Sequence, residues 1–149
     1  MKKSLLFAFT SLAILFSSCD KGTTYPFAPS LYATINKVNW ATNSVTLNSS
    51  GNQFSINAPN PYGGNFVINM PSNITAGTYA LSQTGEYNAI YTNDLNGTLN
   101  NFYSVSGTLV IALSPPGQLE GTFSFTAANI LNASDVITVN NGVFSLNNF

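Results

Sequence analysis

Cys19 carries the only thiol of the 149-residue chain, and its surroundings indicate a defined chemistry for its sulfur. Two lysines follow the initiating methionine, a largely apolar run extends from Leu5 to Phe16, and Ser17-Ser18 directly precede the cysteine. A charged start, an apolar stretch of about a dozen residues and small residues before a cleavage point are typical of a secretory signal. A cysteine directly after that point predicts that its thiol is lipidated, with palmitate as an acyl group, and becomes the new N-terminus. We therefore expect a lipoprotein signal peptide over residues 1–18 and a membrane anchor at Cys19.

The alternative for this segment is an uncleaved N-terminal anchor helix. The apolar run is shorter than the roughly 20 residues that a transmembrane helix needs, which favours the cleaved signal. After the cysteine, residues 19–30 combine Gly22, Pro26 and Pro29 with several hydroxyl side chains and show little periodicity. This composition predicts a flexible tether between the lipid and a folded domain.

The other side chains that commonly do chemistry are scarce. The chain has no histidine, which removes the usual general base, the commonest transition-metal ligand and every Ser-His-Asp or Cys-His arrangement. Four acidic residues remain beyond the tether, Glu86, Asp94, Glu120 and Asp135, and they are isolated from one another in the sequence. We therefore expect no catalytic residues, no metal site and no cofactor, so the chain is predicted not to be an enzyme. A hydrolase stays open only if two of these acids converge across a cleft at the spacing of a glycosidase pair.

Aromatic residues near the expected turns form the one pattern that suits binding. Tyrosine and tryptophan rings stack on the C–H face of a sugar or on a small hydrophobic ligand, and asparagine amides bond to hydroxyls. The alternative is that these rings are ordinary strand residues covering sheet edges, as β-propensity predicts, and Trp40 in particular fits a core anchor. Binding is favoured if several of them line one concavity. The candidate ligand-binding residues are Trp40, Tyr62, Tyr87, Tyr91 and Tyr103.

Charge is sparse along the whole chain and excludes one class of partner. Charged residues make up 6% of the sequence, against about 25% in a typical soluble domain. Without the signal, two lysines face five acidic residues, so no basic surface is available for a phosphate backbone. We therefore expect no binding to nucleic acid. Aromatic and β-branched residues are abundant, which predicts a folded domain rather than disorder.

Strands must position these residues, because the hydrophobic pattern beyond the tether repeats every two residues. The clearest alternating runs cover residues 104–114 and 119–128, and the turn Pro115-Pro116-Gly117 joins them. This arrangement predicts an antiparallel hairpin with one buried and one solvated face. Its alternation places Val105 on the buried face and Ser104 on the solvated face.

Shorter runs with the same period predict the remaining strands at residues 31–35, 40–47, 53–57, 65–70, 77–82, 88–92, 135–140 and 143–146. Glycine-containing pairs between them fit tight hairpin turns. They include Ser50-Gly51-Asn52, Gly63-Gly64, Asn96-Gly97 and Asn141-Gly142. We therefore predict a single all-β domain over residues 31–149. Its fold is an antiparallel β-sandwich or flattened β-barrel of about 8–10 strands, with a filled core rather than a large cavity.

Five segments of the chain carry a resemblance: Ser17-Ser18-Cys19-Asp20-Lys21, Ile35-Asn36-Lys37-Val38-Asn39-Trp40, Ala76-Gly77-Thr78-Tyr79, Gly121-Thr122-Phe123-Ser124-Phe125-Thr126-Ala127 and Asn141-Gly142-Val143-Phe144. In these segments the chain resembles a family of small, uncharacterised lipoproteins from Bacteroidota. The resemblance implies a secreted, lipid-anchored β-domain of unknown function and carries over no catalytic or binding residue.

Together these features predict a lipid-anchored protein of the outer membrane with a non-enzymatic structural or interaction role. The alternative is a module that binds a carbohydrate or a small hydrophobic ligand through its aromatic residues. The expected partners are the membrane, through Cys19, and a glycan or an envelope protein. Many surface-exposed lipoproteins of the group that the chain resembles carry an acid-rich stretch after the cysteine, whereas here Asp20 is the only acidic residue before Lys21. A periplasm-facing and a surface-exposed orientation therefore both stay open.

Overall fold

The computed structural model describes residues 30–59, 63–95, 98–114 and 118–147, and every regular element in these ranges is a β-strand. Cys19, Tyr62 and the expected signal peptide lie outside the described residues. The prediction of an all-β antiparallel fold is confirmed. Its ten strands are β1 (Leu31–Ile35), β2 (Val38–Thr42), β3 (Thr46–Ser50), β4 (Gln53–Pro59), β5 (Asn65–Pro71), β6 (Gly77–Leu81), β7 (Asn88–Leu95), β8 (Thr98–Ser114), β9 (Gln118–Asn129) and β10 (Asn132–Asn147).

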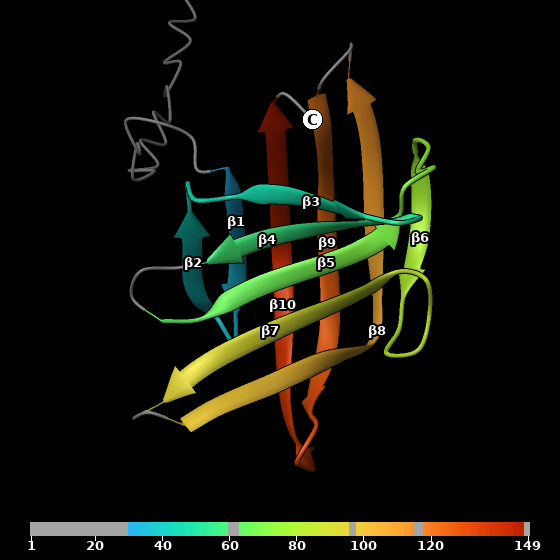
Figure 1. Cartoon of the computed structure of the whole chain (residues 1–149). Helices are drawn as coiled ribbons and strands as arrows, with labels where there is room; N and C mark the ends of the chain where they lie inside the picture. Colours follow the sequence, from blue (N-terminus) through green and yellow to red (C-terminus); the bar gives the residue numbers. More distant parts are fainter. Residues whose placement is uncertain (1–29, 60–62, 96–97, 115–117, 148–149) are drawn as a thin grey trace, which may run out of the picture.

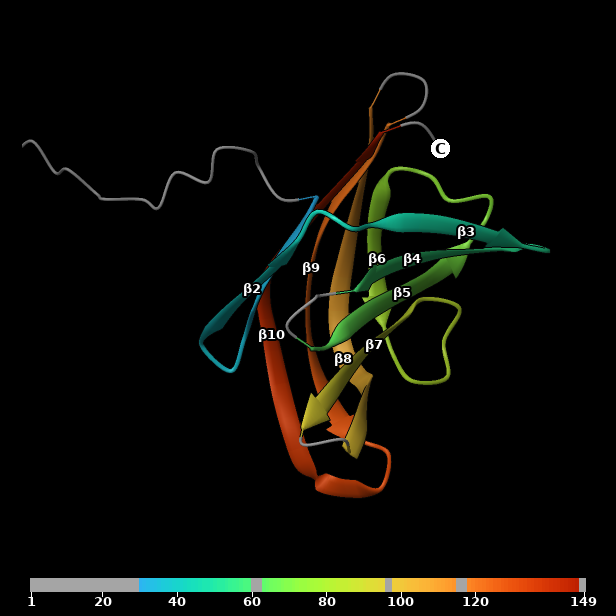
Figure 2. The same ribbon diagram turned by 60° about the vertical axis from the view of Figure 1, so that its left-hand side comes forward.

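The ten strands form one open antiparallel sheet that folds back on itself along β8. The sheet order is β2-β1-β10-β9-β8-β7-β5-β4-β3, and β6 pairs separately with β8. The first part of β8 pairs with β7, while its later part, from Gly107 to Ile111, pairs with β6. As a result, β3, β4, β5 and β7 cross in front of β1, β9 and β10, in a sandwich-like arrangement of two layers (Figure 1). Figure 2 shows the two layers closer to edge-on.

Phe66 of β5 lies at the centre of the core between the two layers. Its ring is fully buried, and its centroid lies 4.6 Å from that of Trp40 and 5.0 Å from that of Tyr91. From the other layer, Phe123 and Phe125 of β9 contact it at centroid distances of 5.8 and 6.2 Å. Edge-to-face and tilted pairs of this kind are the favoured geometry for aromatic rings. The core is therefore packed with rings, as the Phe-rich alternation of residues 119–128 predicts.

The β8–β9 hairpin is confirmed, but its two faces exchange near the start of the predicted run. A bulge lies between Ser104 and Ser106, where β8 shifts register against β9. An extra residue reverses the alternation on one side of it, because side chains along a strand repeat with a period of two. Ser104 is therefore 0% exposed and accepts a hydrogen bond from Ala89 N–H at 3.0 Å, whereas Val105 is 46% exposed. The predicted burial of Val105 and exposure of Ser104 were wrong.

The strand expected over residues 40–47 is in fact two strands in different layers. Thr42 ends β2, donates its hydroxyl to Pro59 O at 2.6 Å, and accepts the N–H of Ser44 at 3.1 Å. These bonds redirect the chain from β2 into β3, which is the opposite edge strand of the sheet. The hydrophobic pattern alone does not show this bend.

The hairpin turn expected at Asn141-Gly142 was also wrong, because β10 runs through both residues. Asn141 has φ of 53° and marks a bulge between Val139 and Gly142, so two predicted strands are one. A Cβ atom at Gly142 would lie 2.6 Å from Cγ of Phe123, which explains why this position has no side chain. The positive-φ turns expected at Gly51 and at Gly63-Gly64 are confirmed.

The β1–β2 turn was not predicted from the sequence. Its central residues, Asn36 and Lys37, have φ values of 47° and 72°, the signs of a type I′ hairpin turn. Asn36 fixes this turn to β10, because its N–H donates to Thr138 O and its Oδ1 accepts Thr138 N–H, both at 2.9 Å. The turn therefore holds the β1–β2 hairpin against β10.

Candidate functional site

The first candidate site, here called the aromatic pocket, opens between the β1–β2 hairpin, the β7–β8 hairpin and the start of β10. Its volume is about 550 Å³. Buried apolar side chains from all three parts form its floor, and asparagines, one carboxylate and the exposed Val38 form its rim. The lining residues are Ile35, Asn36, Val38, Asn39, Trp40, Tyr91, Asn93, Asn100, Phe102, Asp135 and Ile137.

The floor of the aromatic pocket is built from rings that the core already holds in place. Trp40 packs edge-on against Phe66, and Tyr91 lies with its centroid 6.4 Å from that of Phe102. Trp40 and Tyr91 are each 7% exposed. The Tyr91 hydroxyl lies over Gly64, where a Cβ atom would be only 2.9 Å away. The floor is therefore fixed before any ligand arrives.

The rim of the aromatic pocket is ordered by a buried asparagine of β9. Asn129 donates its Nδ2 to Asp135 Oδ2 at 3.1 Å and to Asn100 Oδ1 at 3.3 Å, so it connects β10 with β8. Its Oδ1 in turn accepts the N–H of Leu131 at 3.0 Å. Because Asn129 uses these groups internally, Asp135 and Asn100 are held at the pocket rather than left free to rotate.

The electrostatic character of this pocket follows from one carboxylate and two polar ring groups. Asp135 is the one charged residue among the lining side chains. Burial raises the pKa of the Tyr91 hydroxyl above 10.0, so this group stays neutral near pH 7. The Nε1 of Trp40 is buried and has no hydrogen-bond partner among the described residues. The pocket thus combines an apolar floor with a polar rim that carries one negative charge.

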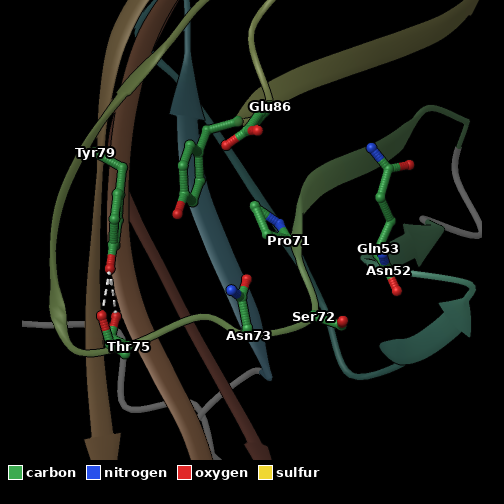
Figure 3. A pocket seen from close by; sticks show the side chains of 9 residues that line it. Asn52, Gln53, Pro71, Ser72, Asn73, Thr75, Tyr79 and Glu86 are labelled. Carbon is green, nitrogen blue, oxygen red and sulfur yellow. Dashed lines mark hydrogen bonds between the residues drawn. The ribbon is translucent and has the colours of Figure 1, made fainter.

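A second candidate site, here called the loop pocket, lies between the β3–β4 turn, the β5–β6 connection and the β6–β7 connection. Its volume is about 710 Å³. Figure 3 shows Tyr79 and Gln53 on opposite sides of it, with Asn73 between them. Amide, hydroxyl and carboxylate groups dominate its lining, which consists of Asn52, Gln53, Pro71, Ser72, Asn73, Thr75, Tyr79, Glu86 and Tyr87.

The predicted aromatic residues are divided between these two places. Trp40 and Tyr91 share the floor of the aromatic pocket, and the expected role of Trp40 in the core is also observed. Tyr87 lines the loop pocket, whereas Tyr103 is half-buried and lines neither pocket. Tyr62 lies outside the described residues.

The sequence did not identify the polar residues of the aromatic pocket. The pairing of β7 with β8 brings Asn93 and Asn100 to this pocket. Asp135 comes from β10, which lies far from both strands in the chain. The asparagines on both sides of the β7–β8 hairpin were a usable signal, because a hairpin places residues equally distant from its turn side by side. Phe102 was not predicted as a pocket residue, because nothing in the sequence distinguishes it from the other phenylalanines of the core.

The acidic residues do not gather at one site. Glu86 lines the loop pocket, Asp135 lines the aromatic pocket, and Glu120 lines a shallow concavity with Ser145, whose hydroxyl donates to its carboxylate at 3.2 Å. Within the described residues, no group of three or more His, Cys, Asp or Glu side chains is arranged to hold a metal ion. The same part of the chain contains no helix with the length and apolar character to cross a membrane.

Comparison with known proteins identifies the family. The family described as a domain of unknown function (DUF6252) matches residues 28–146, and the chain belongs to it. No curated protein and no solved structure matches the chain.

Proposed function

We propose that this member of the DUF6252 family is a lipid-anchored protein of the cell envelope whose β-domain binds a small ligand in the aromatic pocket. One observation carries the proposal: Trp40, Tyr91 and Phe102 come from three different strands to form one fixed floor under a polar rim. The pocket volume of about 550 Å³ lies within the roughly 300–1,000 Å³ of small-molecule sites. Such sites are lined mainly by hydrophobic and aromatic side chains with a few placed polar groups.

The ligand that fits this pocket has an apolar body and a hydrogen-bond donor at one edge. The rings of the floor supply apolar contact area, and Asp135 is an acceptor because an ionised carboxylate has no proton to donate. Asn93 offers an amide group at the same rim. An anionic ligand is disfavoured, since no positively charged side chain lines the pocket to offset Asp135.

The proposed role is binding without a chemical step. The chain lacks histidine, and its one thiol, Cys19, is assigned to the lipid. Asp135 has no second carboxylate among the lining residues of its pocket, so the pair that a glycosidase needs is not formed there.

The anchor is supported by the N-terminal sequence. Residues 19–30 would span at most about 40 Å when fully extended, which sets how far the β-domain can stand from the bilayer. The last of them, Ser30, already bonds to the domain through Asn43 Oδ1 at 3.2 Å and Ser145 N–H at 2.9 Å. We place the protein at the outer membrane, facing either the periplasm or the cell exterior.

The anchor is tested by Cys19→Ser. This variant is expected to lose acyl labelling and to leave the membrane fraction while its β-domain stays folded. Retention in the membrane fraction would overturn the anchor and leave the pocket proposal standing, because the two rest on different residues.

The pocket is tested with the neutral fluorescent probe N-phenyl-1-naphthylamine. Trp40 is the only tryptophan, so energy transfer from it detects probe bound to the β-domain, and the comparison of two variants locates the bound probe. Val38→Asp places a charge at the rim, where Val38 is 70% exposed, and is expected to weaken probe binding about tenfold or more. The matched control is Val143→Asp, because Val143 is 48% exposed on β10 and does not line the aromatic pocket, and this variant is expected to bind the probe as the parent does. No energy transfer, or equal loss in both variants, would refute the pocket as a ligand site and favour an envelope-interaction role.

A further inference from the structure

We propose that the loop pocket is a second, separate binding site whose ligand is a neutral saccharide. It shares no lining residue with the aromatic pocket, so its occupancy does not depend on the function proposed above. The inference rests on three features of the loop pocket. These are a fixed pair of stacked tyrosines, amide side chains that form no internal hydrogen bond, and a lining whose only charge is negative.

The stacked pair consists of Tyr79 and Tyr87. Their ring centroids lie 4.3 Å apart and their planes differ by 15°, so each ring covers one face of the other. The Tyr79 hydroxyl donates to Thr75 O at 2.8 Å and lies 3.0 Å from the Thr75 hydroxyl. Gly77 leaves room for it, because a Cβ atom there would lie 3.2 Å from this hydroxyl. Tyr79 is thus fixed in place and supports one face of the Tyr87 ring.

Tyr87 is positioned from its own side by the β6–β7 connection. Its carbonyl accepts the N–H of Ser82 at 3.1 Å, which closes this turn. Asn88 donates its Nδ2 to Gly85 O at 3.3 Å, and its Oδ1 accepts Nδ2 of Asn69 at 2.8 Å, so the turn is also tied to β5. The opposite wall is closed as well, because Ser72 N–H donates to Asn52 O at 2.8 Å. A site with both walls fixed loses little conformational entropy when a ligand binds.

The polar groups of the loop pocket are available to a ligand. Within the described part of the chain, no hydrogen bond occupies the side chains of Gln53, Asn73 or Glu86. Figure 3 shows these three side chains at different sides of the same hollow. Amides both donate and accept, so they can pair with hydroxyl groups in either sense.

This combination selects a sugar ring over other small molecules. A pyranose presents an apolar C–H face, which stacks on an aromatic ring, and hydroxyls around its edge, which need donors and acceptors in the surrounding plane. A purely apolar ligand would leave the amides desolvated and unpaired, which costs free energy. Glu86 is the one charged residue in the lining of this pocket, so acidic saccharides are repelled.

The experiment uses the chain from residue 19 with Cys19→Ser and ¹⁵N labelling. The labelled protein is titrated with neutral trisaccharides of glucose, mannose, galactose, xylose and N-acetylglucosamine. Trigalacturonate is titrated separately as the acidic saccharide. We expect at least one neutral sugar to shift the side-chain amide signals of Gln53 and Asn73, and trigalacturonate not to shift them. Binding to the loop pocket is expected to leave Trp40 fluorescence unchanged, which separates this site from the aromatic pocket.

Three variants decide the role of the tyrosine stack. Tyr87→Ala is expected to reduce saccharide affinity about tenfold, and Tyr87→Phe to keep it within about threefold, because the ring face rather than the hydroxyl makes the contact. Tyr103→Ala is the matched control, since this half-buried tyrosine lines neither pocket and should leave affinity unchanged. If no neutral sugar shifts the Gln53 and Asn73 signals, if trigalacturonate binds more tightly, or if Tyr87→Ala binds as the parent does, the proposal is wrong.

Discussion

The junction of the two layers at β8 is sensitive to a single methyl group at Gly107. This residue follows the bulge at Ser104–Ser106 and pairs directly with Phe125 of β9. A Cβ atom on Gly107 would lie 2.7 Å from Cα of Phe125 and closer still to the Ser124 carbonyl oxygen. Carbon atoms in contact normally lie about 3.5–4.0 Å apart, so β8 and β9 would have to separate by nearly 1 Å.

The expected cost of Gly107→Ala follows from this geometry. Overpacking of a fixed site costs about 1–3 kcal/mol, and a widened strand pair weakens a neighbouring hydrogen bond by about 1 kcal/mol. Restricting the unfolded chain with alanine returns about 0.5 kcal/mol. We therefore expect a net loss of about 1.5–3.5 kcal/mol in the free energy of unfolding, a large part of the roughly 5–15 kcal/mol that holds a domain folded.

The assay is equilibrium unfolding in urea followed by the fluorescence of Trp40, which is the only tryptophan and is buried against Phe66. Gly51→Ala is the control, because Gly51 has φ of 58° but open space around its Cβ position. It should lose only about 1 kcal/mol from backbone strain. A Gly107→Ala midpoint equal to that of the parent, or a loss no greater than that of Gly51→Ala, would refute the close approach of β8 and β9.

Three further predictions concern single residues. Lys37→Gly is expected to stabilise the fold by about 0.5–1 kcal/mol, because Lys37 has φ of 72° in a turn that favours glycine; an unchanged or lower urea midpoint would contradict this. Ser104→Ala is expected to cost about 1–3 kcal/mol, because the buried N–H of Ala89 loses its acceptor, whereas the exposed Ser106→Ala should stay within about 0.5 kcal/mol; equal midpoints would count against it. Burial raises the pKa of the Tyr91 hydroxyl above 10.0, so this hydroxyl ionises at lower pH in the unfolded chain than in the folded one. The stability that the neutral hydroxyl contributes is therefore fully present below pH 10 and is lost as the pH rises through the folded pKa. Tyr91→Phe should therefore flatten the alkaline loss of stability, and identical pH profiles for the two proteins would show that Tyr91 does not cause it.

The strands could be predicted from the sequence wherever alternation and turn residues agreed. The β8–β9 hairpin shows both signals, since its alternating runs flank Pro115-Pro116-Gly117. The bulge at Val105 was not predictable, because the residues on both sides of it still alternate and only the register against β9 reveals the extra residue. Likewise, the β1–β2 turn carries Lys37 where a type I′ turn favours glycine, so its usual signature is missing.

The pockets could be predicted only in part, because sheet order brings their residues together. Trp40 and Tyr91 were recognised as aromatic candidates, but nothing local shows that β2 and β7 face each other across the fold. The same limit applies to the loop pocket, where Tyr79 of β6 stacks on Tyr87 through a connection whose path the sequence does not specify. Composition indicated the kind of chemistry, whereas the topology determined which side chains share a site.

The pairing of β1 with β10 has a consequence for how the chain is made. In the sheet, β1 pairs with its hairpin partner β2 and with β10. The first strand of the domain therefore cannot complete its pairing before the last strand has been made. Contacts between such distant segments form late and slowly. A ribosome or a translocation channel must therefore release residues up to Phe144 before β1 can pair along its whole length. A nonsense mutation or a proteolytic cut within β10 would remove a wall of the aromatic pocket together with the closure of the fold.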